Sequence, residues 1–497
     1  MERRVSARRG RNVQKAPIRP IRRNLQRMAY FDEKQCDAIH KASLQVLETT
    51  GVVFGLEAAR DVLRNAGASV EGDVVRFPRE LIERALAATP RQFTLCGRAP
   101  DGAEDLLIDG SSSYMNLDGN GMDVIDFSTG ERRGSTLRDL EDATRIADWL
   151  PQISYVWPVA TARDCPEATQ ALWETFIQMK NTSKHIMTMT VASGTTARGV
   201  LEMAAVLCGG MESLREKPFI STFLCATSPL AFETGACEAI VEFAKAGLPT
   251  GIMTMPISGA TAPISVAGNL VQVNTEFLAG LALIQTINPG CPTFYASCTT
   301  LMDLRTGGVT SNGPEDYLLQ AGVAAMSRSK YDIPVMTGIM GTEARFPGWQ
   351  AGVEDSLSCY TSVLCGADMM PGAGLLKNAT TLSFEELLMG CEIYEIIKRT
   401  AEGAPVDEAS LAVEVIERVG PRRDFMTDEH TLTNMRGVWQ PEILRRCSYD
   451  AWEKDARRDA LETARERAAW ILEHHRPQYV AEEKERELRA IIAKYQG

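Results

Sequence analysis

Segments with the pattern of buried strands alternate with segments patterned as amphipathic helices through most of this chain. The clearest unit begins at residues 250–256, a short apolar run of the kind that forms a buried strand. After the loop at 259–263, apolar residues recur at steps of three and four as far as Ile287. That spacing predicts a long helix with Ser265 as its N-cap. A Pro-Gly pair ends the helix, and residues 293–296 begin the next buried strand.

The same alternation continues on both sides of this unit. Strands are predicted at 153–159, 185–191, 219–225, 251–255, 293–298, 335–339 and 367–370, with one more from a hairpin region at 112–127. Helices are predicted to begin near Thr136, Glu167, Thr195, Leu230, Ser265, Pro314, Trp349 and Ser383. About eight strand–helix units predict a parallel sheet closed into a (β/α)8 TIM barrel. An open doubly wound sheet is the alternative, but no glycine-rich nucleotide fingerprint or phosphate-binding loop favours it.

The remaining segments divide the chain into four parts. Residues 1–30 predict a basic extended arm, and residues 31–110 an α-rich N-terminal extension. The α/β barrel is expected at 111–400, with a small β-hairpin region near its start. Residues 401–497 are polar and helical, and we expect C-terminal helices that wrap the barrel.

Composition narrows the classes of function. The chain has 497 residues, is 44% hydrophobic and carries a net charge of −12, so we expect no nucleic-acid partner. The arginine-rich start keeps nucleic-acid binding open as an alternative. No uninterrupted apolar stretch approaches about 18 residues, and no hydrophobic signal segment is present, so we expect no membrane span. Twelve scattered cysteines without paired spacing fit a reducing, cytoplasmic location.

Metal and general-base chemistry find little support in the sequence. There are five histidines and none has a metal-binding spacing, so no metal is expected. A thiolate zinc site from Cys225, Cys298 and Cys365 remains an alternative, although buried, unreactive thiols are the more common role. Lys377, after the last strand, is the one well-placed candidate for a Schiff-base lysine.

Aromatic and small polar residues mark the predicted carboxyl-end loops. Converging aromatic faces attract quaternary ammonium groups by cation–π interaction, worth about 2 kcal/mol for a dry contact. In the loop 341–349 we assign catalytic roles to Glu343, Phe346 and Trp349. As substrate-binding residues we assign Tyr114, Trp157, Phe223, Tyr295, Arg305, Asn312 and Gly341. Arg305 suits a substrate carboxylate, while pairing with Asp303 or Glu315 is its alternative role.

Ordered motifs along nearly the whole chain resemble the trimethylamine methyltransferase family. They include Gly259-Ala-Thr-Ala-Pro263, Asn274-Thr-Glu276, Pro289-Gly-Cys-Pro292 and Gly313-Pro-Glu315. The founding members carry pyrrolysine in the barrel, whereas this chain has only standard residues, including in the corresponding region at 338–349. It therefore resembles the non-pyrrolysine branch, whose studied members demethylate quaternary amines such as glycine betaine.

The resemblance implies a barrel that passes a methyl group from a quaternary amine to the Co(I) of a separate corrinoid protein. The corrinoid then belongs to the partner, and this chain binds no cofactor tightly. A quaternary ammonium leaves as a neutral tertiary amine without a general acid, which suits a site poor in histidine. Methyl transfer directly to tetrahydrofolate and a non-catalytic betaine-binding paralog are the alternatives. Long arms at both ends of the chain favour a homo-oligomer.

Overall fold

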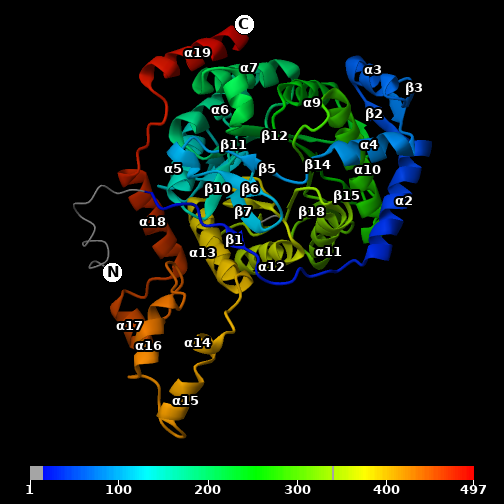
Figure 1. The fold of residues 1–497 in the computed structure, drawn as a ribbon. Coiled ribbons are helices and arrows are strands. Elements are labelled where there is room, and N and C mark those ends of the chain that lie inside the picture. The colour runs from blue at the N-terminus through cyan, green and yellow to red at the C-terminus, as the bar shows by residue number, and fades with distance from the viewer. Residues whose placement is uncertain (1–14, 339–340, 497) are drawn as a thin grey trace.

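Eight parallel strands close into a barrel in the computed structural model, which describes residues 15–338 and 341–496 (Figure 1). The strands are β7 (Ser112–Leu117), β10 (Ile153–Val156), β11 (His185–Thr188), β12 (Ile220–Cys225), β14 (Thr250–Thr254), β16 (Thr293–Ser297), β19 (Val335–Thr337) and β20 (Met369–Ala373). The last strand, β20, pairs back with β7, Met369 opposite Tyr114, so the barrel has no open edge. The predicted (β/α)8 barrel is confirmed. Residues 1–14 of the predicted arm, the predicted strand end Ile339 and Gly497 lie outside the described residues.

Helices connect successive strands and start close to the predicted positions. They are α5 (Leu137–Trp149), α6 (Gln170–Asn181), α7 (Gly194–Cys208), α9 (Thr234–Ala246), α10 (Val266–Ile287), α11 (Pro314–Ala324), α12 (Trp349–Cys365) and α13 (Phe384–Ala401). Serine side chains cap several of them: Ser265 accepts a hydrogen bond from the Gly268 N–H, and Ser383 from the Glu386 N–H.

The long helix α10 lies in the centre of the molecule, between the barrel and the N-terminal extension. It is apolar and long enough to cross a membrane, but 78% of its apolar window is buried inside the structure. Its Glu276 carboxylate accepts hydrogen bonds from the Leu230 N–H and the Ser228 hydroxyl, both at 2.9 Å. A core helix thereby fixes the loop that follows β12.

The N-terminal extension consists of three helices and a small sheet. The helices are α2 (Glu33–Thr49), α3 (Glu57–Asn65) and α4 (Arg79–Ala88), and the strands are β2 (Val52–Phe54), β3 (Ser69–Glu71) and β4 (Val74–Arg76). A barrel loop contributes the fourth strand, β13 (Ala231–Phe232), which pairs with β2. The rings of Phe54 and Phe232 stack at 5.2 Å, so the extension is anchored to the barrel.

The amino end of the barrel is closed by extended chain and a hairpin. Strand β1 (Ile21–Arg22) pairs antiparallel with β7, and the hairpin of β5 (Phe93–Leu95) and β6 (Leu106–Ile108) contacts the starts of β11 and β12. At the same end, the buried Nζ of Lys184 donates to three backbone carbonyls at 2.6–2.8 Å, at the end of α5 and the start of β10.

Two C-terminal helices lie on the barrel and four shorter ones do not. Helix α18 (Ala460–His474) packs on α13 and α5, and α19 (Glu482–Gln496) packs on α7. Between α13 and α18, the chain with α14 (Glu408–Leu411), α15 (Val413–Val419), α16 (Glu429–Asn434) and α17 (Tyr449–Lys454) projects from the body (Figure 1). Of the C-terminal helices that we expected to cover the barrel, α18 and α19 do so. The division of the chain into four parts stays a prediction.

Candidate active site at the carboxyl end of the barrel

Two small sheets stand over the carboxyl end of the barrel. One combines β8 (Asp123–Ile125) and β9 (Arg132–Gly134) with β21 (Leu375–Leu376) and β22 (Thr381–Leu382). The other combines β15 (Ile257–Ser258), β17 (Thr300–Asp303) and β18 (Gly308–Thr310). All of these strands come from loops that follow barrel strands, and in TIM barrels such loops build the active site.

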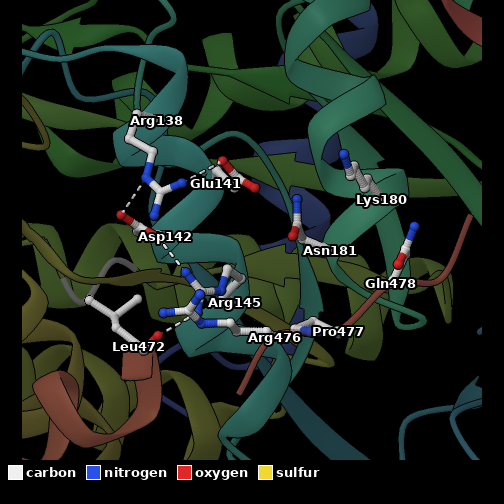
Figure 2. A pocket seen from close by; sticks show the side chains of 10 residues that line it. All are labelled: Arg138, Glu141, Asp142, Arg145, Lys180, Asn181, Leu472, Arg476, Pro477 and Gln478. Atoms are coloured by element: carbon white, nitrogen blue, oxygen red, sulfur yellow. Dashed lines mark hydrogen bonds and ion pairs between the residues drawn. The ribbon is translucent and has the colours of Figure 1, made fainter. Parts of the chain in front are cut away.

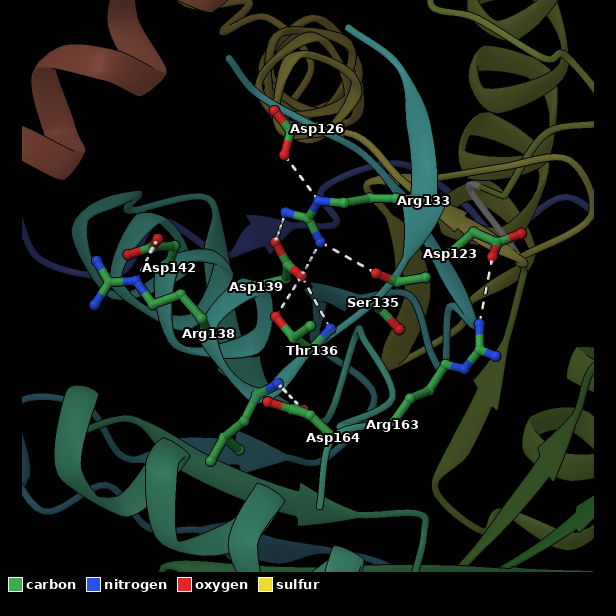
Figure 3. A network of polar contacts seen from close by, with 12 residues as sticks. Asp123, Asp126, Arg133, Ser135, Thr136, Arg138, Asp139, Asp142, Arg163 and Asp164 are labelled. Carbon is green, nitrogen blue, oxygen red and sulfur yellow. Dashed lines mark hydrogen bonds and ion pairs between the residues drawn. The ribbon is translucent and has the colours of Figure 1, made fainter. Parts of the chain in front are cut away.

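A polar network fixes the β8–β9 hairpin to helix α5 (Figure 3). The Arg133 guanidinium donates two hydrogen bonds to Asp139, both at 2.8 Å, and one to Asp126 at 2.8 Å. Asp139 in turn accepts a hydrogen bond from the Thr136 N–H at the start of α5. This side of the mouth is therefore held by charge-assisted bonds to a barrel helix.

A buried aromatic pair lies under these covers. Trp157 directly follows β10 and Phe223 belongs to β12, and their rings meet edge to face with centroids 5.2 Å apart. Their exposed fractions are only 2% and 3%. The indole N–H of Trp157 has no hydrogen-bond partner within the described chain. It lies beside Gly119, where a Cβ would be 3.0 Å from the indole nitrogen and 2.2 Å from the Met189 sulfur, so only glycine lets both side chains come this close to the backbone.

Asp118, the neighbour of Gly119, is a buried acid at the same end of the barrel. Its backbone N–H donates to the carbonyl of Ala373 at the end of β20, at 2.9 Å. One carboxyl oxygen accepts a 2.9 Å hydrogen bond from the Gly119 N–H, and the other has no partner within the described residues. Burial raises the pKa of Asp118 to about 7.

Two more buried acids stand behind Asp118. Asp355 on α12 and Glu386 in the first turn of α13 hydrogen-bond to each other, so one of the two carboxyl groups holds a proton. Burial raises the pKa of both, and the charge of Glu386 raises that of Asp355 further. Asp355 also interacts electrostatically with Asp118. We call Asp118, Asp355 and Glu386 the carboxyl trio.

The thiol groups near the trio are neutral. Burial raises the pKa of Cys225 to about 12, and that of Cys298 also rises because of burial and its acidic neighbour Asp118. Cys365 lies apart, at the far end of α12. Across residues 15–338 and 341–496, no three His, Cys, Asp or Glu side chains are grouped so that they could hold a metal ion. Lys377 is exposed, which gives it no desolvated setting for Schiff-base chemistry.

The loop after β19 brings three predicted site residues together. The Asn312 amide donates a hydrogen bond to the carbonyl of Gly341. The Glu343 carboxylate accepts a hydrogen bond from the Ser311 N–H at 3.0 Å, while its own N–H donates to Glu354 of α12 at 2.9 Å. The loops after β16 and β19 are thus joined at the mouth of the barrel.

Phe346 and Trp349, predicted to be catalytic, lie at the outer edge of the same loop. Their exposed fractions are 72% and 84%, so they do not enclose the buried aromatic pair. Neighbouring mouth loops also expose large apolar side chains, at Met122, Met255, Ile264 and Leu304. Together with Phe346 and Trp349 they form what we call the apolar rim.

Three predicted substrate-binding residues are not brought to this place. The Tyr114 hydroxyl donates to the Leu107 carbonyl of β6, toward the amino end. Tyr295 stacks on Phe277 of α10 with centroids 3.9 Å apart, outside the barrel wall. Arg305 is exposed and makes its hydrogen bonds to Asp303, its alternative role. We therefore leave these three out of the proposed site.

The carboxyl trio was missed from the sequence, although a signal existed. Asp118 directly follows a predicted strand, a position that TIM barrels often use for chemistry. Asp355 and Glu386 interrupt the buried faces of two predicted helices, where an acid is rarely found without a partner.

A polar hollow of about 430 Å³ lies elsewhere, on the outside of the helical layer (Figure 2). It is lined by α5, by the end of α6 and by the segment between α18 and α19. Its cations are largely paired: Arg138 with Asp142, Arg145 with Asp142, and Lys180 with Glu485. These pairings, and its position away from the mouth, set it apart from the candidate site.

Comparison with known proteins identifies the family of the chain. The chain matches the family model described as trimethylamine methyltransferase (MTTB) over residues 1–496. It is 33% identical to trimethylamine methyltransferase MttB of Desulfitobacterium hafniense, covering 94% of this chain and 93% of that protein. It is 32% identical to glycine betaine methyltransferase of another strain of D. hafniense, covering 93% and 96%.

A solved structure shares the fold. The monomethylamine methyltransferase MtmB of Methanosarcina barkeri superposes with a TM-score of 0.52 at 13% identity, covering 90% of this chain and 88% of that one. Fold and relatives together define a TIM-barrel enzyme. The chain belongs to the trimethylamine methyltransferase family and is a methyltransferase of the methylamine and betaine type.

Proposed function

We propose that this enzyme takes a methyl group from a quaternary amine of the glycine betaine type and delivers it to the Co(I) of a separate corrinoid protein. The observation that carries the proposal is the buried Trp157–Phe223 pair next to an unpaired acid at the mouth of the barrel. Aromatic faces and a carboxylate both attract a fixed positive charge. The glycine betaine methyltransferase among the relatives supports the same choice.

The positions of the histidines favour a quaternary substrate. His40 contacts Tyr331 beneath the N-terminal extension, and His185 bonds the Cys96 carbonyl at the amino end of the barrel. The other three belong to the C-terminal region. None of the five therefore stands at the mouth to protonate a leaving group. A quaternary amine needs no such proton, because the electron pair of the broken C–N bond stays on nitrogen.

In this proposal the residues of the chain act by holding and orienting the substrate. Corrinoid cobalt, when docked, supplies the nucleophile for the methyl carbon. Trp157 and Phe223 hold the ammonium head and keep water away, which points one N–CH3 group toward the open end. The joined loops with Asn312, Gly341 and Glu343 form the other wall of the site.

The apolar rim is our proposed docking surface for the corrinoid protein. Aromatic and methionine side chains are enriched in protein interfaces, and exposed apolar patches mark such places. Phe346 and Trp349 would then serve methyl transfer through partner contact. This keeps a role for both predicted catalytic residues at the mouth.

We also propose a homo-oligomer. Helices α14, α16 and α17 have no buried residue, although helices this short depend on packing for stability. The segment leaves the barrel at Ala401. The carbonyl of Ala401 accepts a hydrogen bond from the Asn24 N–H, which belongs to the extended chain around β1 at the amino end. A second copy of the chain can cover it there without blocking the mouth.

The test is a substrate panel with purified protein and chemically reduced cobalamin. Glycine betaine, proline betaine, carnitine, γ-butyrobetaine, choline and trimethylamine are compared by the absorbance of methylated cobalamin. We expect methylation with a quaternary amine and none with trimethylamine. Binding without methylation would favour folate as acceptor or a binding protein, and no binding at all would reject the substrate class.

A further inference from the structure

We infer that Asp118, supported by the Asp355–Glu386 pair, is the counter-charge of the bound ammonium group, and that binding of the cation expels one proton from the carboxyl trio. The inference rests on the proposed function, because it takes the ligand to be a fixed cation. Beyond the proposed function, the inference names the acids that face the ammonium charge. It also predicts that a proton is released on binding, which the aromatic pair alone does not predict.

The trio is buried without a cation of its own. The exposed fractions of Asp118, Asp355 and Glu386 are 4%, 1% and 1%. Among the residues that the structure describes, no Lys, Arg or His side chain forms a salt bridge with any of them. A buried carboxylate without a positive partner is costly, so a group that arrives with positive charge is strongly favoured here.

Two unpaired polar atoms from different strands indicate a ligand that carries both charges. One is the free carboxyl oxygen of Asp118 after β7, and the other is the indole N–H of Trp157 after β10. Both residues adjoin Gly119, yet neither bonds to the other. The first attracts a cation and the second donates to an anion. A small zwitterion with an ammonium group and a carboxylate satisfies both.

The proton balance follows from electrostatics. Before the ligand enters, one proton is shared by Asp355 and Glu386, and burial holds the pKa of Asp118 near 7. A fixed cation beside Asp118 favours the ionised carboxylate, and the released proton passes to solvent. No bond of the ligand is made or broken in this step. The positive charge that enters with the ligand is balanced by the proton that leaves.

The titratable groups around Asp118 come from three sides of the mouth. They are Cys298 directly after β16 with Cys225 of β12 behind it, Asp355 from α12 and, through Asp355, Glu354 of the same helix and Glu386 from α13. Burial raises the pKa of both thiols far above neutrality, so they stay protonated throughout. The carboxyl trio is thus the group that titrates on binding.

Calorimetry tests the inference on the wild-type protein. Glycine betaine and tetramethylammonium are titrated in buffers of different ionisation enthalpy between pH 6 and 8.5. We expect release of about one proton at pH 6 and none at pH 8.5, with affinity rising about tenfold per pH unit below pH 7. Failure of both cations to bind, or binding without proton release at pH 6, overturns the inference.

An isostere with an uncharged head group separates charge from shape. In 3,3-dimethylbutanoate, carbon replaces the ammonium nitrogen of glycine betaine and the outline is kept. We expect it to bind the wild type at least tenfold more weakly than glycine betaine, without proton release. Equal affinity for the two compounds would mean that the site reads shape only, and would overturn the inference.

Single substitutions test which residues release the proton and hold the cation. Asp118→Asn should abolish proton release and weaken glycine betaine binding about tenfold or more, while binding of the isostere is kept. Glu386→Gln should move the midpoint of the affinity–pH curve to lower pH, because it removes a neighbouring acid. Asp303→Asn, a half-buried acid of the mouth paired with the exposed Arg305, is the control and should bind like the wild type. Wild-type binding and proton release in Asp118→Asn would overturn the assignment.

The outcomes also separate this inference from the proposed function. Methylation of cobalamin from a quaternary amine without proton release upholds the proposed function and rejects the inference. Binding with proton release but without methylation upholds the inference and rejects methyl transfer to the corrinoid.

Discussion

Both ends of the barrel bury acids, but Asp148 and Asp368 at the amino end are paired with cations, whereas the carboxyl trio, within the described chain, is not. At the amino end, the Asp148 carboxylate accepts hydrogen bonds from Lys15 at 2.7 Å and Tyr479 at 2.9 Å and lies 2.8 Å from His475. Asp368 forms a 2.6 Å salt bridge with Arg328. At the carboxyl end, the carboxyl trio has no such partner.

The pKa values of two aspartates show the difference. Burial by itself would raise the pKa of Asp148, but the hydrogen bond with His475 and the charge of Lys15 bring it below its usual range. Asp118 is equally buried and lacks those partners, so its pKa rises to about 7. The same residue type is thus paired and stabilising at one end of the barrel and buried without a positive partner at the other.

Removal of a paired acid at the amino end should have the largest effect on stability. Asp148→Ala removes the buried acid that Lys15 and His475 contact and leaves Glu104 as the one acid paired with Lys15, and we expect the free energy of unfolding to fall by about 3–5 kcal/mol. Urea unfolding at pH 7 measures it. Glu141→Ala, on the same helix and paired with the exposed Arg138, is the control and should cost about 1 kcal/mol or less. Equal losses would remove the contrast between buried and surface pairs.

Removal of the unpaired acid should instead stabilise the protein at high pH. The folded-state pKa of Asp118 lies above its unfolded value, so stability is lost as pH rises from about 4 to 7. Asp118→Asn should avoid that loss and gain about 1–4 kcal/mol at pH 8, with less difference at pH 5. Thermal unfolding at the two pH values measures it. A gain that does not depend on pH would contradict the burial of an unpaired charge.

The aromatic pair should affect binding by an intermediate amount. Trp157→Ala should weaken glycine betaine binding by about 2 kcal/mol, because a dry cation–π contact is lost. Trp157→Phe keeps an aromatic face and should lose less. Tyr295→Phe is the control, since its ring lies against Phe277 outside the barrel, and its calorimetric affinity should match the wild type. A weaker affinity in the control would place Tyr295 in the site after all.

The apolar rim should give the smallest and most selective effect. Phe346→Ser with Trp349→Ser should raise the KM for the corrinoid protein by an amount equivalent to about 1–2 kcal/mol, because exposed aromatic contacts are lost. The rate with free cobalamin should stay unchanged, which a parallel assay checks. An equal loss with free cobalamin would move both residues from docking to chemistry.

The barrel was predictable from sequence because its signal is repeated. Each unit pairs an apolar run with a helix-spaced segment, so an error at one boundary, such as Leu230 for the true start at Thr234, leaves the count intact. The side of the barrel wall on which one residue lies has no such redundancy. Neighbouring residues of a strand face opposite sides of the sheet, so an error of one position exchanges inside and outside. Trp157 packs against Phe223, whereas Tyr295 faces outward to Phe277 of α10.

The carboxyl trio shows a second limit of sequence-based prediction. Asp118 is buried by packing of chain that lies far away in sequence, including Asp355 on α12 and Glu386 on α13. Local patterns cannot report a contact across more than two hundred residues. The exposed positions of Phe346 and Trp349 depend in the same way on where the mouth loops end in space.

The extended chain before α2 also bears on the order of folding. Strand β1 pairs with β7, but Arg23 next to it donates a 2.6 Å hydrogen bond to the carbonyl of Ala367, 344 positions later in the chain. Loop closure over such a span is slow. The contact that holds this segment in place therefore forms late in folding, at the end of the barrel opposite the candidate site.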